Sequence, residues 1–386
     1  MSIKRIYLKI KDALLPYRLA AKQPGGLRYK AKYLHYARLA RRKGVVYFRI
    51  ERVADEYTYD WFNLKGVSQA DKEWFCRRGL APYKLHWYNL TKENYRDYLS
   101  DFVFYDRRNY MDRAFLNLFE HKLNTYLMLA PFSDNMPEHY FYKKGESFLR
   151  IGGEGKCGSA REVLDLIKRG PIAAKSCIGG HGRGFYKFHY VEGGYYINNE
   201  AKNEEEVIRL LNKLDDYILT EYVTPHHIFS EICGANTFPP VIRCITIYDK
   251  NDGAQLTASV IRLGSKAAGI VTDYHGTIYC GVELTTGKMF KPIWRENDTT
   301  FIGISEHPDT GVKLDGIIIP DWQELRSLIL KVSSYLPWTP YLVTDIIPSE
   351  DGFKILEINS HGQAKNCEAH YPFNLNEYQK KIFKAQ

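Results

Sequence analysis

From residue 139 onward the chain consists of short apolar segments separated by turn residues, a pattern that predicts β-strands. Strands are predicted over residues 139–142, 148–151, 172–175, 185–189, 195–198, 218–222, 241–248, 255–263, 341–347 and 353–358. Two of the connections between them are short enough for β-hairpins, and hairpins join antiparallel strands. The pattern therefore predicts antiparallel sheet.

Apolar residues recur at helical spacing in six other segments. Helices are predicted over residues 3–15 (ending at Pro16), 29–43, 112–129, 160–169, 204–213 and 322–336. Ser159 and Glu162 have the spacing of a capping box at the start of the fourth helix. Helices and strands are mixed without regular strand–helix–strand alternation, which predicts an α+β fold. Residues 45–105 alternate aromatic and charged positions without a clear period, so the pattern predicts no elements there.

The charge of the 386-residue chain is concentrated at its start. The whole chain has a net charge of +9, yet residues 1–50 contain fourteen Lys and Arg but one acid, Asp12. The first 50 residues therefore have a net charge of +13 and the rest a net charge of −4. Basic amphipathic helices bind anionic membrane surfaces or acidic partners such as acidic polymers. The alternative is that these helices pack their apolar stripe on the core and leave a solvated basic face. No nucleic-acid partner is expected, because the sequence contains no RNP-like, zinc-finger or helix-turn-helix motif.

Cysteine content and hydropathy indicate the compartment. There are seven cysteines, an odd number; their spacing is irregular and no C-x-x-C motif occurs. This favours reduced thiols in the cytoplasm over a disulfide framework or a zinc site. No uncharged apolar run approaches the roughly 18 residues of a membrane-spanning helix. The N-terminal segment is interrupted by lysine and arginine, unlike a secretory signal.

Three oxygen-bearing side chains occupy the last predicted hairpin. A three-residue loop, Glu350 to Gly352, would place Asp345 directly opposite Glu357, and strand alternation places Asn359 on the same face as Glu357. Carboxylate and amide oxygens in this number are typical ligands of Mg²⁺ that is also held by substrate phosphates. The alternative is a solvated polar face of the sheet.

A second motif is a lysine followed by a glycine-rich segment. Lys175 ends the predicted apolar strand 172–175, and four glycines follow within six residues: Gly179, Gly180, Gly182 and Gly184. Such a loop can present backbone N–H groups to phosphates while the lysine supplies charge. It is not a Walker A loop, and a flexible hairpin turn is the alternative.

The order and spacing of these motifs resemble the ATP-grasp superfamily, in particular the sugar-transfer-associated ATP-grasp family of polysaccharide-synthesis genes. The resemblance covers about residues 110–370. It matches Lys122 and Lys175 with the two lysines that contact ATP phosphate, and residues 179–184 with the lid loop. It matches the strand end formed by Glu221, Tyr222 and Val223 with the hinge segment that hydrogen-bonds adenine.

The same resemblance implies the remaining site residues and the domain organisation. Arg243 is similar to the arginine near the transferred phosphate, and Asp345, Glu357 and Asn359 match the magnesium ligands. The implied fold has two α+β subdomains that clamp ATP. Accordingly, we expect a basic, mainly helical region over residues 1–105, an N-terminal and lid subdomain over 106–222, and a C-terminal subdomain with the metal site over 223–386.

The activity implied by the resemblance is that of an ATP-dependent carboxylate–amine ligase. Two Mg²⁺ ions would clamp the ATP phosphates, and Lys122, Lys175 and Arg243 would stabilise phosphate charge while a carboxylate forms an acylphosphate. An amine then forms the amide, so no side-chain nucleophile is required. The expected substrate is a sugar acid or an amino-acid-modified glycan in surface polysaccharide (capsule) assembly, in the cytoplasm or peripherally at the inner membrane face. The alternatives are an inactive, nucleotide-binding partner of a glycosyltransferase complex and an ATP-grasp kinase.

Overall fold

The computed structural model describes residues 3–45, 49–105, 118–152, 157–179, 184–234, 238–268, 275–297, 299–360 and 362–383, with side chains from residue 13 onward. The chain forms two compact units. The first unit contains Met1–Met111, Ile293–Gly303 and Ala364–Gln386, and the second unit contains Asp112–Pro292 and Ile304–Gln363. The boundaries expected from the sequence, 105/106 and 222/223, stay predictions.

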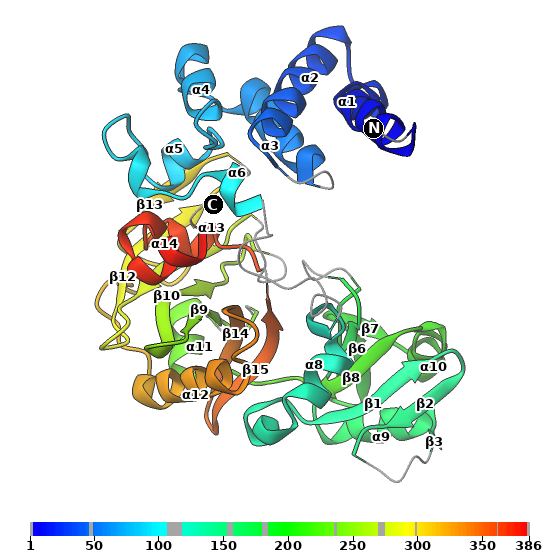
Figure 1. The fold of residues 1–386 in the computed structure, drawn as a ribbon. Coiled ribbons are helices and arrows are strands. Elements are labelled where there is room, and N and C mark those ends of the chain that lie inside the picture. Colours follow the sequence, from blue (N-terminus) through cyan, green and yellow to red (C-terminus); the bar gives the residue numbers. More distant parts are fainter. Residues whose placement is uncertain are drawn as a thin grey trace. The chain divides into compact units, whose positions relative to one another are not determined.

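The first unit is mainly helical (Figure 1). Its elements are α1 (Ile3–Lys22), α2 (Leu27–Arg42), α3 (Ile50–Asn63), α4 (Gln69–Cys76), α5 (Lys84–Trp87), the 3₁₀ turn η2 (Tyr95–Asp97), α6 (Asp101–Tyr105), β13 (Phe301–Gly303), α13 (Lys365–Glu368), η5 (Phe373–Leu375) and α14 (Glu377–Phe383). The predicted helix over 29–43 is confirmed as α2. The predicted end at Pro16 is wrong, because α1 continues to Lys22 with Pro16 inside it.

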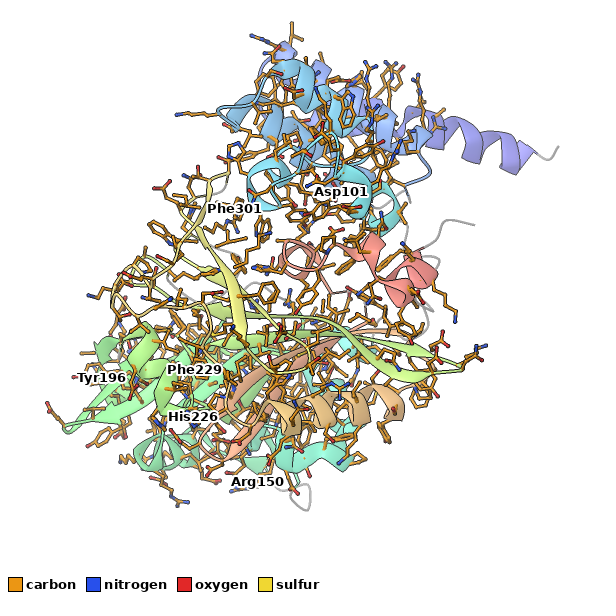
Figure 2. All side chains as sticks on the ribbon, turned by 90° about the vertical axis from the view of Figure 1, so that its left-hand side faces the viewer. Asp101, Arg150, Tyr196, His226, Phe229 and Phe301 are labelled. Atoms are coloured by element: carbon orange, nitrogen blue, oxygen red, sulfur yellow. The ribbon has the colours of Figure 1, made fainter. Side chains whose placement is uncertain are left out.

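Buried charged and aromatic side chains form much of the core of the first unit. Lys84 is buried and pairs with Asp101 at 2.8 Å and with Glu368 at 3.5 Å. Phe301 stacks on Trp87 with ring centroids 4.4 Å apart, and both Asp101 and Phe301 can be followed in Figure 2. Sequence periodicity predicted no elements over residues 45–105 because it treats every charged residue as exposed, whereas some of these are buried.

The first sheet of the second unit has eight strands, all antiparallel, in the order β3-β2-β1-β8-β4-β5-β6-β7. Their bounds are β1 His139–Lys144, β2 Ser147–Arg150, β3 Cys157–Gly158, β4 Ile172–Ser176, β5 Tyr186–Val191, β6 Gly194–Ile197, β7 Glu200–Lys202 and β8 Tyr217–Glu221. Helices α9 (Ala160–Arg169) and α10 (Glu204–Lys213) share a hydrophobic core with one face of this sheet. Each of these helices begins at an N-cap side chain, Ser159 and Asn203. Asn203 and Glu206 form a full capping box, whereas the Glu162 carboxylate pairs with Arg150, labelled in Figure 2.

Strand alternation decides what the opposite face of this sheet carries. In β4, Ile172 and Ala174 belong to the core shared with the helices, so Lys175 lies on the other face. Lys175 pairs with Ile218 of β8, and Thr220 of β8 lies on the same face. The face turned away from α9 and α10 therefore carries a lysine beside a threonine.

The second sheet has seven antiparallel strands in the order β13-β12-β11-β10-β9-β14-β15 (Figure 1). The remaining elements are β9 Val241–Asp249, β10 Gly253–Leu263, β11 Ile278–Val282, β12 Met289–Arg295, β14 Tyr341–Ser349, β15 Gly352–Asn359, α11 (His227–Cys233) and α12 (Trp322–Tyr335). The α12 helix packs on β9 and β10. The predicted α+β class with antiparallel sheets is confirmed, whereas β11, β12, β13 and α11 were not predicted.

The predicted helix over 112–129 needs a correction. Residues 112–117 lie outside the described residues, and residues 118–120 are helical. His121 then adopts an extended conformation and pairs with Ile178, and a new helix, α8, runs over Lys122–Met128 before the 3₁₀ turn η4 (Ala130–Asn135). The interruption places His121 beside the segment that follows β4.

No helix within the described residues combines the length and the apolar composition needed to cross a membrane.

Candidate nucleotide and metal site

The β14–β15 hairpin brings the three predicted oxygen ligands together. Asp345 pairs with Glu357, and Val343 pairs with Asn359, so Glu357 and Asn359 lie on one face of β15. The predicted register is confirmed, but the predicted three-residue loop is wrong. Ser349 pairs with Gly352 across a two-residue loop, and a bulge at Leu356 restores the register.

Asp345 is held by two arginines. Its carboxylate accepts hydrogen bonds from Arg243 Nε at 2.8 Å and Nη2 at 2.7 Å, and from Arg262 Nη2 at 3.0 Å. All three side chains are buried. Burial by itself would raise the pKa of Asp345, but the Arg243 and Arg262 guanidiniums outweigh it and lower this pKa to about 2. Asp345 is therefore an ionised partner of two cations.

Arg262 was missed by the sequence reasoning. It lies in β10 near the end of the run Leu256–Leu263, which is otherwise apolar or small and uncharged. A single arginine in such a buried strand needs a partner, and this is the signal that could have found it.

The donor chemistry fits Mg²⁺. Glu357 and Asn359 are partly buried, and the Asn359 Nδ2 donates to Glu357 Oε1 at 3.0 Å, which aligns the two side chains. Two carboxylates and an amide oxygen are the kind of ligands this ion prefers. A carboxylate has about four lone-pair sites, so Asp345 can accept three N–H donors and still offer a site to a cation. The metal role of these residues stays a prediction.

A cavity of the second unit gathers charged groups from both of its sheets. Lys122, Lys175 and Glu357 line it together with Thr125, Met136, Pro137, His139, Ile218, Thr220 and Leu356. Burial, and to a smaller extent the charge of Lys122, lower the pKa of Lys175 to about 8, although the Glu357 carboxylate acts to raise it. Two lysines facing one carboxylate leave an excess of positive charge at this cavity. An excess of this sign favours an anion such as a phosphate chain.

The glycine-rich segment is described only at its ends. Gly179 has φ +124° and Gly184 has φ +70°, conformations that favour glycine. A Cβ on Gly184 would also lie 2.5 Å from the Tyr217 hydroxyl. Gly180 and Gly182, both predicted to contact ATP, lie outside the described residues. Lys122 Nζ donates to the Gly179 carbonyl at 3.0 Å, so the first predicted phosphate lysine contacts the start of this loop.

The predicted hinge follows β8. The amide of Glu221 donates to Glu138 O at 2.8 Å and that of Tyr222 donates to Pro171 O at 3.0 Å, so both amides are bonded within the protein. The Glu221 carbonyl accepts from the Thr220 hydroxyl at 3.0 Å and keeps a second lone pair. Val223 is buried against Val241 and Ile347. Among the backbone groups of the three residues predicted to contact adenine, the Glu221 carbonyl and the Val223 amide are therefore the candidates for hydrogen bonds to adenine.

Comparison with known proteins identifies the family. The model described as "Sugar-transfer associated ATP-grasp" matches residues 105–379. No curated protein matches the chain.

Several solved structures align with the chain at low similarity. A D-alanine–D-alanine ligase from Bacillus anthracis complexed with ATP is 12% identical, with 69% of this chain and 64% of that chain covered and a TM-score of 0.36. VanG D-Ala:D-Ser ligase from Enterococcus faecalis is 11% identical, with 69% and 60% covered and a TM-score of 0.37.

N5-carboxyaminoimidazole ribonucleotide synthetase from Thermus thermophilus is 10% identical, with 65% and 48% covered and a TM-score of 0.35. In each case less than two thirds of the other protein's length is matched. The family model, in contrast, spans most of the chain and includes both sheets with their predicted motifs. The chain belongs to the sugar-transfer associated ATP-grasp family.

Proposed function

We propose that the protein is an ATP-dependent ligase that joins a carboxylate to an amine through an acylphosphate. The observation that carries this proposal is the cavity where Lys122 and Lys175 lie with Glu357. Two cations and a candidate metal ligand that converge on one point have the charges needed to bind a phosphate group together with its cation. Family membership supports the same interpretation.

Each residue has a distinct role in this proposal. Lys175 and Lys122 bind phosphate oxygens, and binding to Lys122 competes with its bond to the Gly179 carbonyl. The start of the glycine-rich loop would thereby respond to the nucleotide. The Glu221 carbonyl and the Val223 amide bind the adenine edge, with Tyr222 between them. Gly179, Gly180, Gly182 and Gly184 belong to the loop that covers the phosphates and excludes water.

Asp345, Glu357 and Asn359 would hold one or two Mg²⁺ ions. When bound, these ions would neutralise phosphate charge. Arg243 stabilises the charge on the transferred phosphoryl group. Its two bonds to Asp345 hold the guanidinium in place, which reduces the reorganisation needed during reaction.

The proposed reaction has two steps. A carboxylate oxygen of the substrate attacks the γ-phosphorus, the bond to the β,γ-bridging oxygen breaks, and ADP leaves. An amine then attacks the carbonyl carbon, the C–O bond to phosphate breaks, and the amine loses a proton as the amide forms. No side chain forms a covalent bond. In keeping with this, burial raises the pKa of the Cys244 thiol to about 12, which keeps it protonated and a poor nucleophile.

For the substrate, we propose a sugar acid or an amino-acid-modified glycan of surface polysaccharide assembly. The family description and the basic residues 1–50 support this choice. The carboxylate and the amine would be small molecules or glycans. The protein would act in the cytoplasm, with residues 1–50 on an acidic polysaccharide or at the inner membrane face.

The arginine pairs of Asp345 favour one alternative. Both oxygens of Asp345 already accept hydrogen bonds from guanidinium groups. Asp345 therefore has less capacity for a cation, as expected of an inactive, nucleotide-binding partner of a glycosyltransferase complex. A kinase is the third candidate.

Thermal unfolding with and without Mg-ATP tests the proposed site. Ligand at about 100 times its dissociation constant should stabilise the wild type by roughly 2.7 kcal/mol. Glu357→Gln should lose the magnesium-dependent part of this shift. The exposed Glu324→Gln on α12 is the matched control and should keep it. Absence of any shift in the wild type would overturn the nucleotide site.

ADP release then separates the three candidates. A ligase should release ADP in repeated turnovers only when a carboxylate and an amine are both present. A kinase would release it without an amine. An inactive partner would bind Mg-ATP and release none with any pair of sugar acid and amine.

A further inference from the structure

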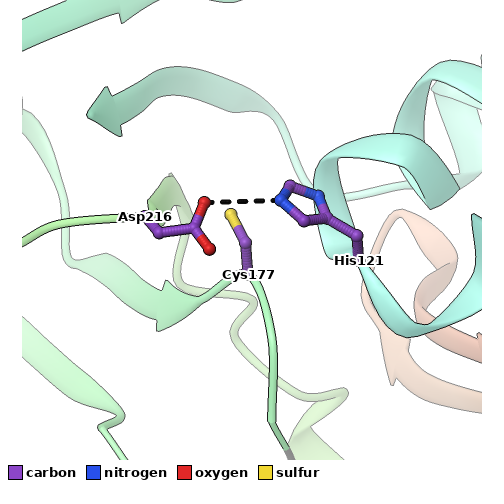
Figure 3. Close-up of side chains that lie close together, drawn as sticks. All are labelled: His121, Cys177 and Asp216. Carbon is purple, nitrogen blue, oxygen red and sulfur yellow. Dashed lines mark hydrogen bonds and ion pairs between the residues drawn. The ribbon is translucent and has the colours of Figure 1, made fainter. Parts of the chain in front are cut away.

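A second cluster of ligand-type side chains lies on the first sheet of the second unit. His121, Cys177 and Asp216 each place a ligand atom within 4.8 Å of the other two (Figure 3). None of the three has a role in the proposed ATP reaction. His121 precedes α8, Cys177 follows β4 and Asp216 precedes β8, so three segments distant in sequence meet here.

The backbone holds these three residues together. Lys122 N donates to Cys177 O at 3.0 Å, and Cys177 N donates to Asp216 O at 2.8 Å. His121 also forms a β-bridge with Ile178. The side chains therefore converge because their main chains are tied by hydrogen bonds, and not through a chance contact of flexible surface groups.

One distance within the cluster matches that between neighbouring ligand atoms of a tetrahedral metal site. His121 Nε2 lies 3.3 Å from Asp216 Oδ1, with the Cys177 thiol beside this pair (Figure 3). Metal–ligand bonds of about 2.0–2.3 Å in tetrahedral geometry put neighbouring ligand atoms roughly 3.3–3.6 Å apart. The Tyr142 hydroxyl donates to Asp216 Oδ1 at 2.8 Å and orients the carboxylate, as outer partners of metal ligands do.

One polar atom of the cluster lacks a hydrogen-bond partner in the part of the chain that the structure describes. His121 Nδ1 is shielded from solvent and has no hydrogen-bond partner among the described residues. The Cys177 side chain is fully buried, whereas His121 and Asp216 keep about a fifth of their side-chain surface exposed. An ion can therefore reach the cluster from the histidine and aspartate side.

We propose that His121, Cys177 and Asp216 bind a zinc ion that ties together the two phosphate-lysine segments and the strand leading to the hinge. A thiolate, an imidazole and a carboxylate are the ligand types of Zn²⁺ sites, and three protein ligands leave the fourth position for water. Binding displaces the proton of the Cys177 thiol into solvent.

The position of the site means that bound zinc would affect nucleotide binding. His121 is adjacent to Lys122, Cys177 lies two residues after Lys175, and Asp216 begins the segment that ends at Glu221. Fixing these segments in advance lowers the ordering cost of ATP binding. This consequence depends on the proposed function, whereas zinc binding itself does not.

The test uses the full chain, stripped with a chelator and titrated with zinc alone against a chromogenic competitor. One zinc per chain is expected. Cys177→Ser should weaken binding at least about 100-fold, by analogy with the 10–100-fold effect of losing even an outer partner. Cys157→Ser is the matched control, since Cys157 is exposed in β3 outside the cluster, and should bind as the wild type does.

Cobalt gives a readout that does not depend on affinity. Co²⁺ in the site should show the near-ultraviolet thiolate charge-transfer band and the visible bands of tetrahedral cobalt, and Cys177→Ser should lose the charge-transfer band. Asp216→Asn keeps the thiol and should weaken binding while retaining that band. It serves as the second variant if Cys177→Ser fails to fold.

Two results would overturn the proposal. One is a chain that binds no zinc without nucleotide. The other is zinc binding that survives Cys177→Ser but is lost in His227→Ala, which would place the ion at the more exposed cluster of His226, His227 and Glu350. Both measurements omit ATP, so they fail or succeed independently of the ligase proposal.

Discussion

Asp345 accepts hydrogen bonds from two arginine side chains, and all three groups are buried. Such an arrangement is stable only while every charge keeps its partner. In the proposed site, Asp345 therefore has two functions at once, as a metal ligand and as the counter-ion that holds Arg243. Glu357, by contrast, is partly exposed and accepts from Asn359.

This difference predicts unequal stability effects at two neighbouring carboxylates. Asp345→Asn should lower the free energy of unfolding by about 3–5 kcal/mol, because two buried guanidiniums lose their negative partner. Glu357→Gln should change it by less than about 1 kcal/mol, as is usual for a partly exposed side chain. Urea unfolding of both variants measures the difference, and equal stabilities would contradict the structural role of Asp345.

At the scale of elements, the β14–β15 hairpin shows how local and distant features combine. The pairing of Asp345 with Glu357 depends on a two-residue loop at one end and on a bulge at Leu356 further along. Gly352 allows the tight loop because its φ is +99°. With the bulge kept, a loop longer or shorter by one residue would move Glu357 to the other face relative to Asp345.

Gly352→Ala should therefore destabilise the protein by about 1–3 kcal/mol through backbone strain alone, since no atom lies near the added Cβ. Gly170→Ala is the control, because Gly170 has an extended backbone and also has space for a Cβ. It should be neutral or slightly stabilising. A Gly352→Ala protein as stable as this control would show that the positive φ carries no cost.

Helix α3 carries a buried carboxylate with a pH-dependent effect on stability. Asp60 accepts from the Tyr83 amide at 2.9 Å, and burial, with contributions from Glu56 and Asp101, raises its pKa to about 7 despite that bond and Lys365. Between about pH 4 and pH 7 the folded protein keeps a proton that the unfolded chain has lost. Stability should therefore fall as the pH rises through this window.

Asp60→Asn should remove this dependence. A shift of about three pKa units corresponds to roughly 4 kcal/mol, so the variant should lose that much less stability than the wild type between pH 4 and pH 8. Asp134→Asn, at an exposed aspartate of η4, serves as the control. If the stabilities of the wild type and Asp60→Asn changed with pH in the same way, Asp60 would not be the source of the pH dependence.

At the scale of the whole molecule, charge is divided along the chain. Residues 1–50, with a net charge of +13, belong to the first unit. In this region Leu14, Tyr17 and Leu27 are large apolar side chains that remain exposed. Exposed apolar groups beside basic ones are typical of segments that bind anionic membranes.

Replacing Lys4, Arg5, Lys9 and Lys11 with glutamine should weaken binding to phosphatidylserine vesicles by more than about 100-fold, at about 1 kcal/mol per residue. The side chains of these four lie outside the described residues. The same charge removal at the exposed Lys213, Lys250, Lys313 and Lys331 is the control and should change vesicle binding little. Unchanged binding of the first variant would refute the membrane proposal, and ATP binding should be the same in both.

The sequence by itself determined those features that depend on neighbours along the chain. Strand alternation, the Ser159 cap and the position of Lys175 near the end of β4 are local, so periodicity and turn chemistry predicted them. The pairing of Asp345 with Glu357 was also predicted, but from a three-residue loop. In the structure a two-residue loop together with the bulge at Leu356 produces the same pairing.

Tertiary structure alone decided which distant residues share an environment. The pairing of Arg262 with Asp345 joins strands that are far apart in sequence, and His121, Cys177 and Asp216 meet only because β4, β8 and the start of α8 are hydrogen-bonded side by side. The folding of residues 45–105 depends on buried charges such as Lys84, whose partner Glu368 is far along the chain. A local pattern cannot find such partners, because the free energy that stabilises a buried charge comes from groups that sequence spacing does not specify.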